Sequence, residues 1–245
     1  MHRVEKGLVL RVAPYRDADE MLTILTECDG KITAAARGVR RKSSRISAAV
    51  QSRAYSEFTL YEASGRFTVN EAEALELFFS LRGDLVRLAC ANYFAEVLDQ
   101  AADEEVANPE LLRLGLNALY ALSRGVGELL AIKAAFELKI AAFSGYMPNL
   151  ASCAQCGAPL QEGVFDPRLG LCFCRACAHG GVPVTPGVLQ AMQFILKSDV
   201  RRMFAFRLGE EGLRALADIC EMYLAQQFDR EFKTLTFYHS IEGLI

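Results

Sequence analysis

The sequence has no tryptophan, and its 245 residues include only three histidines, which are scattered along the chain. It also lacks the motifs G-x-S-x-G, H-E-x-x-H and G-x-x-x-x-G-K-[ST], which carry the reactive groups of many hydrolases, zinc proteases and P-loop enzymes. Carboxylates cluster only in short runs such as Asp103-Glu104-Glu105, which are typical of a solvated helix end. We therefore expect no catalytic residues and no enzyme.

The sequence has no long uninterrupted apolar run. Its most apolar stretch, Leu129 to Phe143, contains Lys133, Glu137 and Lys139, whereas a spanning helix needs roughly 20 mainly apolar residues. This stretch predicts a buried helix of a soluble domain. The first 13 residues alternate charged and apolar types and have no apolar signal-peptide core. We expect a cytoplasmic protein, in which cysteines stay reduced and clustered cysteines indicate a metal site.

The charges nearly balance, at 27 basic against 30 acidic residues. A net charge of −3 argues against a globally basic nucleic-acid binder. A local basic patch is still effective, because charges are screened over roughly 8 Å at physiological salt. Apolar residues make up 52 % of the chain, enough for a folded core. The length fits one large domain or two to three small modules.

Five strand-like segments occupy the first 80 residues. They are Gly7–Val12, Met21–Thr26, Lys31–Arg37, Tyr55–Glu62 and Arg66–Glu71. Asp29-Gly30 separates the second and third segments with a hairpin signal. Five short strands favour a closed barrel, because closure removes exposed strand edges. We predict an OB-type barrel, although strand number alone also fits an SH3-like one.

From Asp84 the apolar pattern becomes helical. Helices are expected from Asp84, from Pro109 and over Leu129–Ser144, and again after Pro186 and over Gly209–Phe228. The sequence thus predicts an α+β multidomain protein with an N-terminal OB-type β-barrel followed by helical segments, which a stretch rich in Cys, Gly and Pro interrupts between Met147 and Pro186.

Four cysteines show the spacing C-x₂-C-x₁₇-C-x₂-C, which lies in the range expected of a four-thiolate zinc site. They are Cys153, Cys156, Cys174 and Cys177. Four protein ligands leave no open coordination position, so the predicted zinc, one per chain, is structural. The alternative is a set of buried or redox-active thiols. Cys172 and His179 are competing ligands, whereas Cys28, Cys90 and Cys220 fit the pattern of core thiols.

Seven basic residues and no acidic one lie between Gly30 and Ser56. We predict that six of them contact phosphates from a mobile loop beside the barrel: Lys31, Arg37, Arg40, Arg41, Lys42 and Arg45. The alternative is a solvated surface loop without a ligand. Aromatic side chains that could stack on bases are Tyr15, Tyr55, Phe58, Tyr61 and Phe67. The sequence does not say which of them face water.

Several of these segments together resemble the RecO family of bacterial recombination-mediator and repair proteins. The matching segments, in chain order, are Gly7–Arg11 with Tyr15 and Asp19, Leu25-Thr26, Gly30-Lys31, Ala36–Arg45, Glu71–Glu73, Phe136–Leu138, Gly145–Pro148, Cys153 and Cys156. The chain departs from the family at Val50–Arg53, where a Leu-Gln-Pro-Phe-like stretch is usual. Many relatives lack a complete cysteine set, so the zinc prediction rests on the spacing.

The resemblance implies an OB-fold DNA-binding domain over 1–80, an α-helical domain over 81–149 and 183–245, and a four-cysteine zinc finger over 150–182 that is inserted in the helical domain. It further implies binding to ssDNA and dsDNA, annealing of complementary strands, and loading of RecA with RecR onto DNA coated by single-strand-binding protein (SSB). The SSB C-terminal tail is an expected partner, for which Arg201, Arg202, Arg207 and Arg214 are candidate rim residues. The implied location is the bacterial nucleoid. The alternative function is a zinc-ribbon adaptor whose barrel binds protein rather than DNA.

Overall fold

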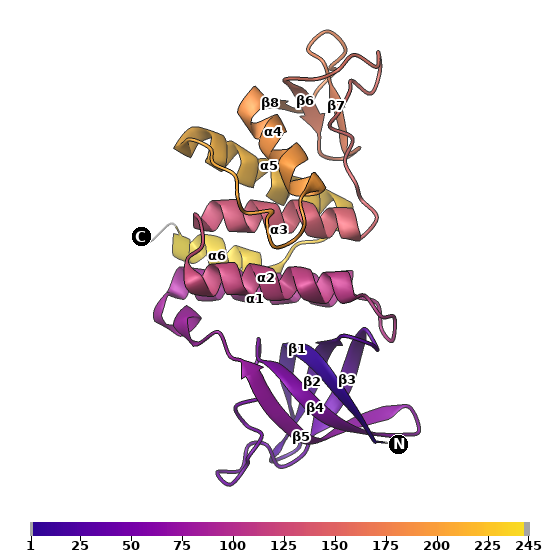
Figure 1. Cartoon of the computed structure of the whole chain (residues 1–245), viewed down its shortest axis with the longest axis vertical. Coiled ribbons are helices and arrows are strands. Elements are labelled where there is room, and N and C mark those ends of the chain that lie inside the picture. The colour runs from indigo at the N-terminus through magenta and orange to yellow at the C-terminus, as the bar shows by residue number, and fades with distance from the viewer. Residues whose placement is uncertain (1, 243–245) are drawn as a thin grey trace. The chain divides into compact units, whose positions relative to one another are not determined.

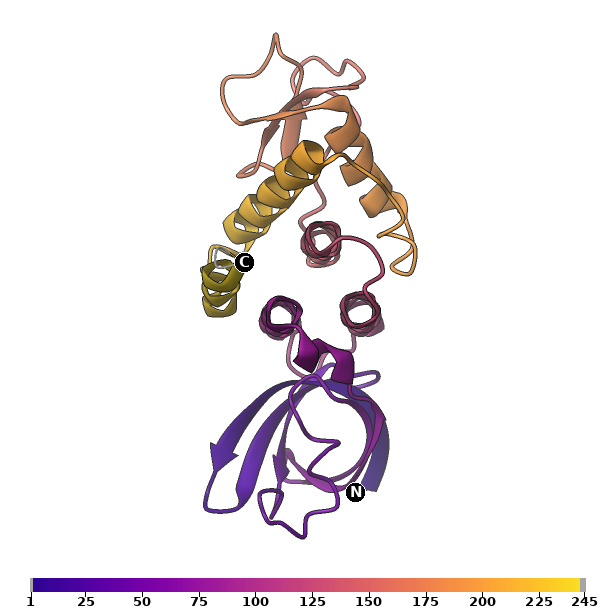
Figure 2. The same cartoon turned by 90° about the vertical axis from the view of Figure 1, so that its left-hand side faces the viewer.

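The computed structural model describes residues 2–242, and its first five strands close into a barrel (Figures 1 and 2). The strands are β1 (His2–Tyr15), β2 (Asp19–Thr26), β3 (Lys31–Ala36), β4 (Tyr55–Ala63) and β5 (Arg66–Glu76). Their order around the barrel is β1-β2-β3-β5-β4, and β3 and β5 are the parallel pair. Bulges near Val9 and Thr59 let the long strands curve. The predicted OB-type barrel is confirmed.

Alternating apolar residues fill the barrel, as the strand pattern requires. Leu22, Ile24, Phe58 and Leu60 are all fully buried in its core. The segment between β3 and β4, residues 37–54, contributes further side chains to the same core. We call residues 37–54 the cap segment, because its apolar residues cover the barrel interior.

The barrel and three helices form one compact unit, which comprises the described residues up to Ser123 and those from Lys233 to Glu242. The helices are α1 (Leu85–Ala101), α2 (Pro109–Arg124) and α6 (Lys233–Glu242), with the 3₁₀ helix η1 (Phe79–Gly83) before α1. The predicted helix start at Asp84 is confirmed: its side chain accepts a hydrogen bond from Arg87 N–H at 3.0 Å. Gly115 allows α2 to pack against Leu98 of α1.

Residues Arg124–Phe232 form the second unit. It contains α3 (Leu129–Phe143), the strands β6 (Gly163–Asp166), β7 (Leu171–Phe173) and β8 (Val182–Val184), and the helices α4 (Pro186–Lys197) and α5 (Glu210–Phe228). The strands form a small sheet in the order β7-β6-β8. α3 packs against both α4 and α5 and is buried over most of its length.

The charged residues of α3 have partners within the second unit. Lys133 forms an ion pair with Glu137 at 2.7 Å and a second with Glu221 of α5. Burial alone would lower the pKa of Lys133, but the two carboxylates raise it above its usual value. Lys139 donates hydrogen bonds to the carbonyl oxygens of Ile195, Leu196 and Ser198, and so satisfies the carboxyl end of α4. These contacts explain how a largely buried helix carries three charges.

The structure adds elements that the sequence pattern did not indicate, namely η1, α6 and the three short strands. It also assigns α1, α2 and α6 to the unit of the barrel and α3, α4 and α5 to the other unit. The division into domains 1–80, 81–149, 150–182 and 183–245 stays a prediction. Within residues 2–242, no helix is both long and apolar enough to cross a membrane.

Candidate nucleic-acid interface and metal site

Two hairpin tips of the barrel border a groove on its outer surface. The β1–β2 tip contributes Tyr15 and Arg16, and the β4–β5 tip contributes Ser64, Gly65 and Arg66. Ser64 and Gly65 both have positive φ, at 51° and 70°, which is typical of the tight two-residue turn between antiparallel strands. The two hairpin turns place Arg16 and Arg66, which are 50 positions apart in the sequence, on one concave surface.

The floor of the groove is formed by outward-facing residues of the adjacent strands β2, β3, β5 and β4. They are Met21, Thr33, Ala35, Thr68, Asn70 and Tyr61. The cavity has a volume of about 1010 Å³. We call it the barrel groove. OB folds use this combination of a strand face and the tips of these two hairpins to bind oligonucleotides.

The charge of the barrel groove is mainly positive, since its lining includes Arg16, Arg37 and Arg66 against one carboxylate, Asp19. Within residues 2–242 none of the three arginines forms a salt bridge. The carboxylate of Asp19 accepts a hydrogen bond from the Gly38 backbone N–H at 2.8 Å. The three guanidinium groups are therefore available to an anionic ligand.

Two aromatic side chains in the barrel groove are exposed to solvent. Tyr15 and Tyr61 each have 42 % of their surface accessible. The Arg16 guanidinium lies 5.1 Å from the centre of the Tyr15 ring, and the His2 ring lies 5.1 Å from that of Tyr61. Of the other candidate aromatics, Phe58 and Phe67 belong to the barrel core and Tyr55 is half-buried. The structure thus separates the candidates that the sequence left together.

The residues of the predicted basic run lie in different environments. Arg37 lines the barrel groove, and the remaining cap-segment residues Arg40, Arg41, Lys42 and Arg45 are exposed. Lys31 does not join them, because its side chain is only 15 % exposed. Its ammonium donates to the carbonyl oxygen of Asp99 at 2.6 Å and lies 3.5 Å from that residue's carboxylate. Lys31 thus has protein partners at the end of α1.

The cap segment, which we expected to be a mobile loop, is held against the barrel. Val39 and Val50 are 4 % and 1 % exposed in the barrel core. Arg53 donates its backbone N–H to Val9 O at 2.7 Å, and its guanidinium binds the side chain of Asn92 in α1. The stretch Val50–Arg53, where the chain departs from the family pattern, is therefore part of the fold. Its exposed residues include the charged side chains of Arg37, Arg40, Arg41, Lys42 and Arg45.

Arg16 and Arg66 are the groove residues that the sequence analysis missed. They lie outside the basic run, and each is an isolated arginine next to a hairpin turn. The sequence does place each of them at a turn between two long strands. Only the strand order of the barrel shows that the two turns border the same groove.

The second unit brings the four predicted cysteines together. The sulfur atoms of Cys153, Cys156, Cys174 and Cys177 all lie within 4.8 Å of one another. Four sulfurs around one tetrahedral zinc, at about 2.3 Å each, are separated by roughly 3.8 Å. The Cys156–Cys174 sulfur distance of 3.9 Å agrees with that geometry. The cluster can therefore hold a metal ion.

Both C-x₂-C pairs form tight turns that point two sulfurs inward. Gly157 N–H donates to Cys153 O at 2.9 Å, and Cys177 N–H donates to Cys174 O at 3.0 Å. Backbone N–H groups of Cys156 and Cys174 lower the pKa of Cys153 to about 6, which favours its thiolate form. The donor set and the turns both suit zinc.

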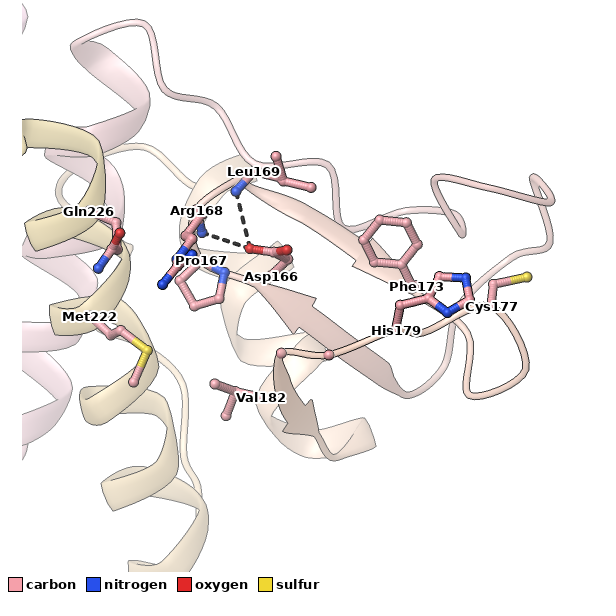
Figure 3. Close-up of a pocket in the computed structure, with 12 residues that line it drawn as sticks. Asp166, Pro167, Arg168, Leu169, Phe173, Cys177, His179, Val182, Met222 and Gln226 are labelled. Atoms are coloured by element: carbon pink, nitrogen blue, oxygen red, sulfur yellow. Dashed lines mark hydrogen bonds between the residues drawn. The ribbon is translucent and has the colours of Figure 1, made fainter.

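The two competing ligands do not belong to the cluster formed by the described residues. Cys172 is fully buried in β7, where it pairs with Phe165, and burial raises the pKa of its thiol. His179 instead lines a pocket of about 590 Å³ between the small sheet and α5. Figure 3 shows its ring near Cys177 and Phe173, away from Met222 and Gln226 of α5.

Comparison with known proteins links these features to one family. Residues 1–78 match the model of the recombination protein O N-terminal domain, and residues 82–236 match that of its C-terminal domain. The chain belongs to the RecO family. The DNA repair protein RecO of Acetivibrio thermocellus is 30 % identical to it over 97 % of this chain and 96 % of that protein. Those of Desulforudis audaxviator and Anaeromyxobacter sp. are 35 % and 34 % identical, over 95 % and 93 % of this chain and 94 % of each relative.

The RecO assignment gives the chain a role in DNA repair and recombination. The two family models divide the chain just after the barrel. The barrel groove lies in the part that matches the RecO N-terminal model, and the cysteine cluster lies in the part that matches the C-terminal one. The two candidate sites thus lie in parts of the chain that match two different RecO family models.

Proposed function

We propose that this RecO-family protein binds single-stranded DNA in the barrel groove. The observation that carries the proposal is the set of three arginines without a salt bridge beside two exposed tyrosines on an OB barrel. Guanidinium groups bind phosphates, and the tyrosine rings offer faces on which bases stack without regard to sequence. A site with these properties needs no catalytic residue.

We further propose that the cap segment extends the same cationic surface. Its exposed residues Arg40, Arg41, Lys42 and Arg45 add four charges to the three of the groove. Annealing requires a protein to neutralise two phosphate backbones and leave the base edges free to pair. Seven cations on one barrel fit binding of ssDNA and dsDNA and annealing of complementary strands.

The metal proposed for the cysteine cluster is one structural zinc per chain. Cys153, Cys156, Cys174 and Cys177 would hold it, and the ion would fix the loops that flank the β7-β6-β8 sheet. The sheet is tied to α5 by its own contacts as well. Tyr223 packs edge-on against Phe165, and Gln227 donates a hydrogen bond to Pro167 O at 2.8 Å.

The proposed partners are RecR, the SSB tail and, through them, RecA, as expected for a recombination mediator of the RecO family that acts on nucleoid DNA in the bacterial cytoplasm. Arg201, Arg202 and Arg207 are exposed in the second unit and remain candidates for the acidic tail. Arg214 is a weaker candidate, because it pairs with Glu210 at 2.7 Å.

The test is a salt series of fluorescence-anisotropy titrations with labelled poly-dT and mixed-sequence oligonucleotides. In Arg16→Ala/Arg66→Ala the log–log salt slope for single strands should flatten by about 1.4, at roughly 0.7 per lost phosphate contact. Affinity for all sequences should fall alike. Arg113→Ala, an exposed arginine on α2, is the control and should bind as the wild type does.

The same titration decides between DNA binding and the adaptor alternative. A protein-binding barrel predicts weak DNA affinity that Arg16→Ala/Arg66→Ala leaves unchanged. An annealing assay with two complementary labelled strands then tests the mediator activity directly. Annealing that the wild-type protein does not accelerate would refute the mediator proposal.

A further inference from the structure

The barrel groove contains one carboxylate, and its presence is unexpected in a site for a polyanion. Asp19 opens β2 beside Arg16, and it is the single acidic residue among those that line the groove. A negative charge near bound phosphates opposes binding. The contacts of Asp19 give a reason for its position.

Asp19 and the two residues before it hold the beginning of the cap segment. The Asp19 Oδ1 atom accepts a hydrogen bond from Gly38 N–H at 2.8 Å. Ala18 O accepts one from the Arg40 backbone N–H at 3.1 Å, and the Arg40 guanidinium lies 3.5 Å from Asp17 O. Three successive residues of the β1–β2 tip thus bind the stretch from residue 38 to residue 40.

The conformation of this stretch depends on Gly38. Its φ is +64°, in the left-handed region that other residues adopt only at an energetic cost. The reversal at Gly38 lies between Arg37, which lines the groove, and Arg40, which lies against the hairpin tip. The hydrogen bond from Gly38 to Asp19 therefore fixes the point at which the chain turns between two cations.

We propose that Asp19 is a positioning residue that strengthens DNA binding through its acceptor oxygen, in spite of its charge. This inference rests on the proposed function of the barrel groove. In the free protein the bond already holds Arg37 and Arg40 in place. DNA binding therefore does not have to order this segment, and the conformational entropy that such ordering would cost is not lost. Without the bond, part of the binding free energy is spent on ordering the segment.

The proposal and simple electrostatics predict opposite signs. Asp19→Ala removes one negative charge and the acceptor, and we expect poly-dT affinity to fall by about three- to tenfold, the usual effect of one lost hydrogen bond. Asp19→Asn removes the same charge but keeps an acceptor oxygen, so its affinity should equal or exceed that of the wild type. Electrostatics alone predicts tighter binding for both variants.

Asp17→Ala is the matched control in the same turn. Its exposed carboxylate makes no hydrogen bond within residues 2–242, while the backbone oxygen that Arg40 approaches is retained. This variant should bind DNA as tightly as the wild type or more tightly. Gly38→Ala tests the same anchor from its other side and should weaken binding as Asp19→Ala does, although its charge is unchanged.

Thermal unfolding of each variant is recorded first, and Gly38→Ala replaces Asp19→Ala if the latter does not fold. Weaker binding by Asp19→Ala or Gly38→Ala, with retained binding by Asp19→Asn and Asp17→Ala, supports the proposal. Tighter binding by Asp19→Ala, or unchanged binding by Gly38→Ala, overturns it. An equal loss of DNA affinity in Asp19→Ala and Asp19→Asn also overturns it, because the acceptor oxygen that Asp19→Asn keeps would then make no contribution to DNA binding.

The outcome for Arg16→Ala/Arg66→Ala separates this inference from the proposed function. If that double variant binds DNA as the wild type does, the groove is not the DNA site and the proposed function fails. If the double variant loses affinity while Asp19→Ala does not, the groove stands and only the role of Asp19 is refuted.

Discussion

Lys31 is the first residue of β3 and Arg37 directly follows that strand. Both carry the same charge and belong to the same basic run, yet the structure predicts different consequences for their loss. Lys31 is nearly buried and bonded to Asp99, whereas Arg37 is exposed in the barrel groove. Changing each to alanine removes one positive charge. We expect Lys31→Ala to affect stability and Arg37→Ala to affect DNA binding.

The magnitudes follow from these contacts. Lys31→Ala removes the ammonium donor of the Asp99 carbonyl oxygen and leaves the Asp99 carboxylate with Arg11, at 3.8 Å, as its remaining ion-pair partner, which should lower the free energy of unfolding by about 1–3 kcal/mol. Arg37→Ala should change it by no more than about 0.5 kcal/mol. Seven cations on a single strand give a salt slope of about −5, and Arg37→Ala should flatten it by about 0.7. Lys31→Ala should leave the slope unaltered.

Urea unfolding followed by circular dichroism measures the first quantity, and anisotropy titrations with poly-dT at several salt concentrations measure the second. The titrations must be run where Lys31→Ala is fully folded. If Lys31→Ala flattens the slope as much as Arg37→Ala, the Lys31 side chain reaches DNA and our structural assignment is refuted. A stability loss confined to Arg37→Ala would contradict the burial argument as well.

Three further predictions concern the metal site and the two units. In Cys174→Ser, metal analysis should find well below one zinc per chain, and the free energy of unfolding should fall. Cys172→Ser should retain the metal. The reverse result would make Cys172 the zinc ligand in place of Cys174. Glu137→Leu should cost about 3–5 kcal/mol in urea unfolding, because it removes a buried lysine's main carboxylate partner, and a loss below about 1 kcal/mol would contradict that role. Gly30→Ala should destabilise far more than Gly65→Ala. Both positions have positive φ, but only at Gly30 would a Cβ strike the backbone of the α1–α2 connection, so equal losses would refute the packing argument.

Features that depend on local patterns were predictable from the amino-acid sequence alone. Alternating apolar residues indicated five strands, and Gly30 lies at positive φ before β3, although the connection from β2 has four residues rather than the two of the predicted Asp29-Gly30 turn. The C-x₂-C spacing identified four sulfurs that the fold does bring together. Such patterns suffice because neighbours in the chain fix strand alternation and knuckle turns.

Which of the candidate residues lie together on one surface could not be predicted without the three-dimensional fold. The barrel groove combines Arg16, Arg37 and Arg66 because the order β1-β2-β3-β5-β4 brings two hairpin tips and one cap segment to the same surface. That order depends on long-range strand pairing. The structure places Lys31 apart from the barrel groove for the same reason, since its partner Asp99 is 68 positions away. A basic residue in a sequence has a charge, but its partners and exposure come from the packing of distant segments.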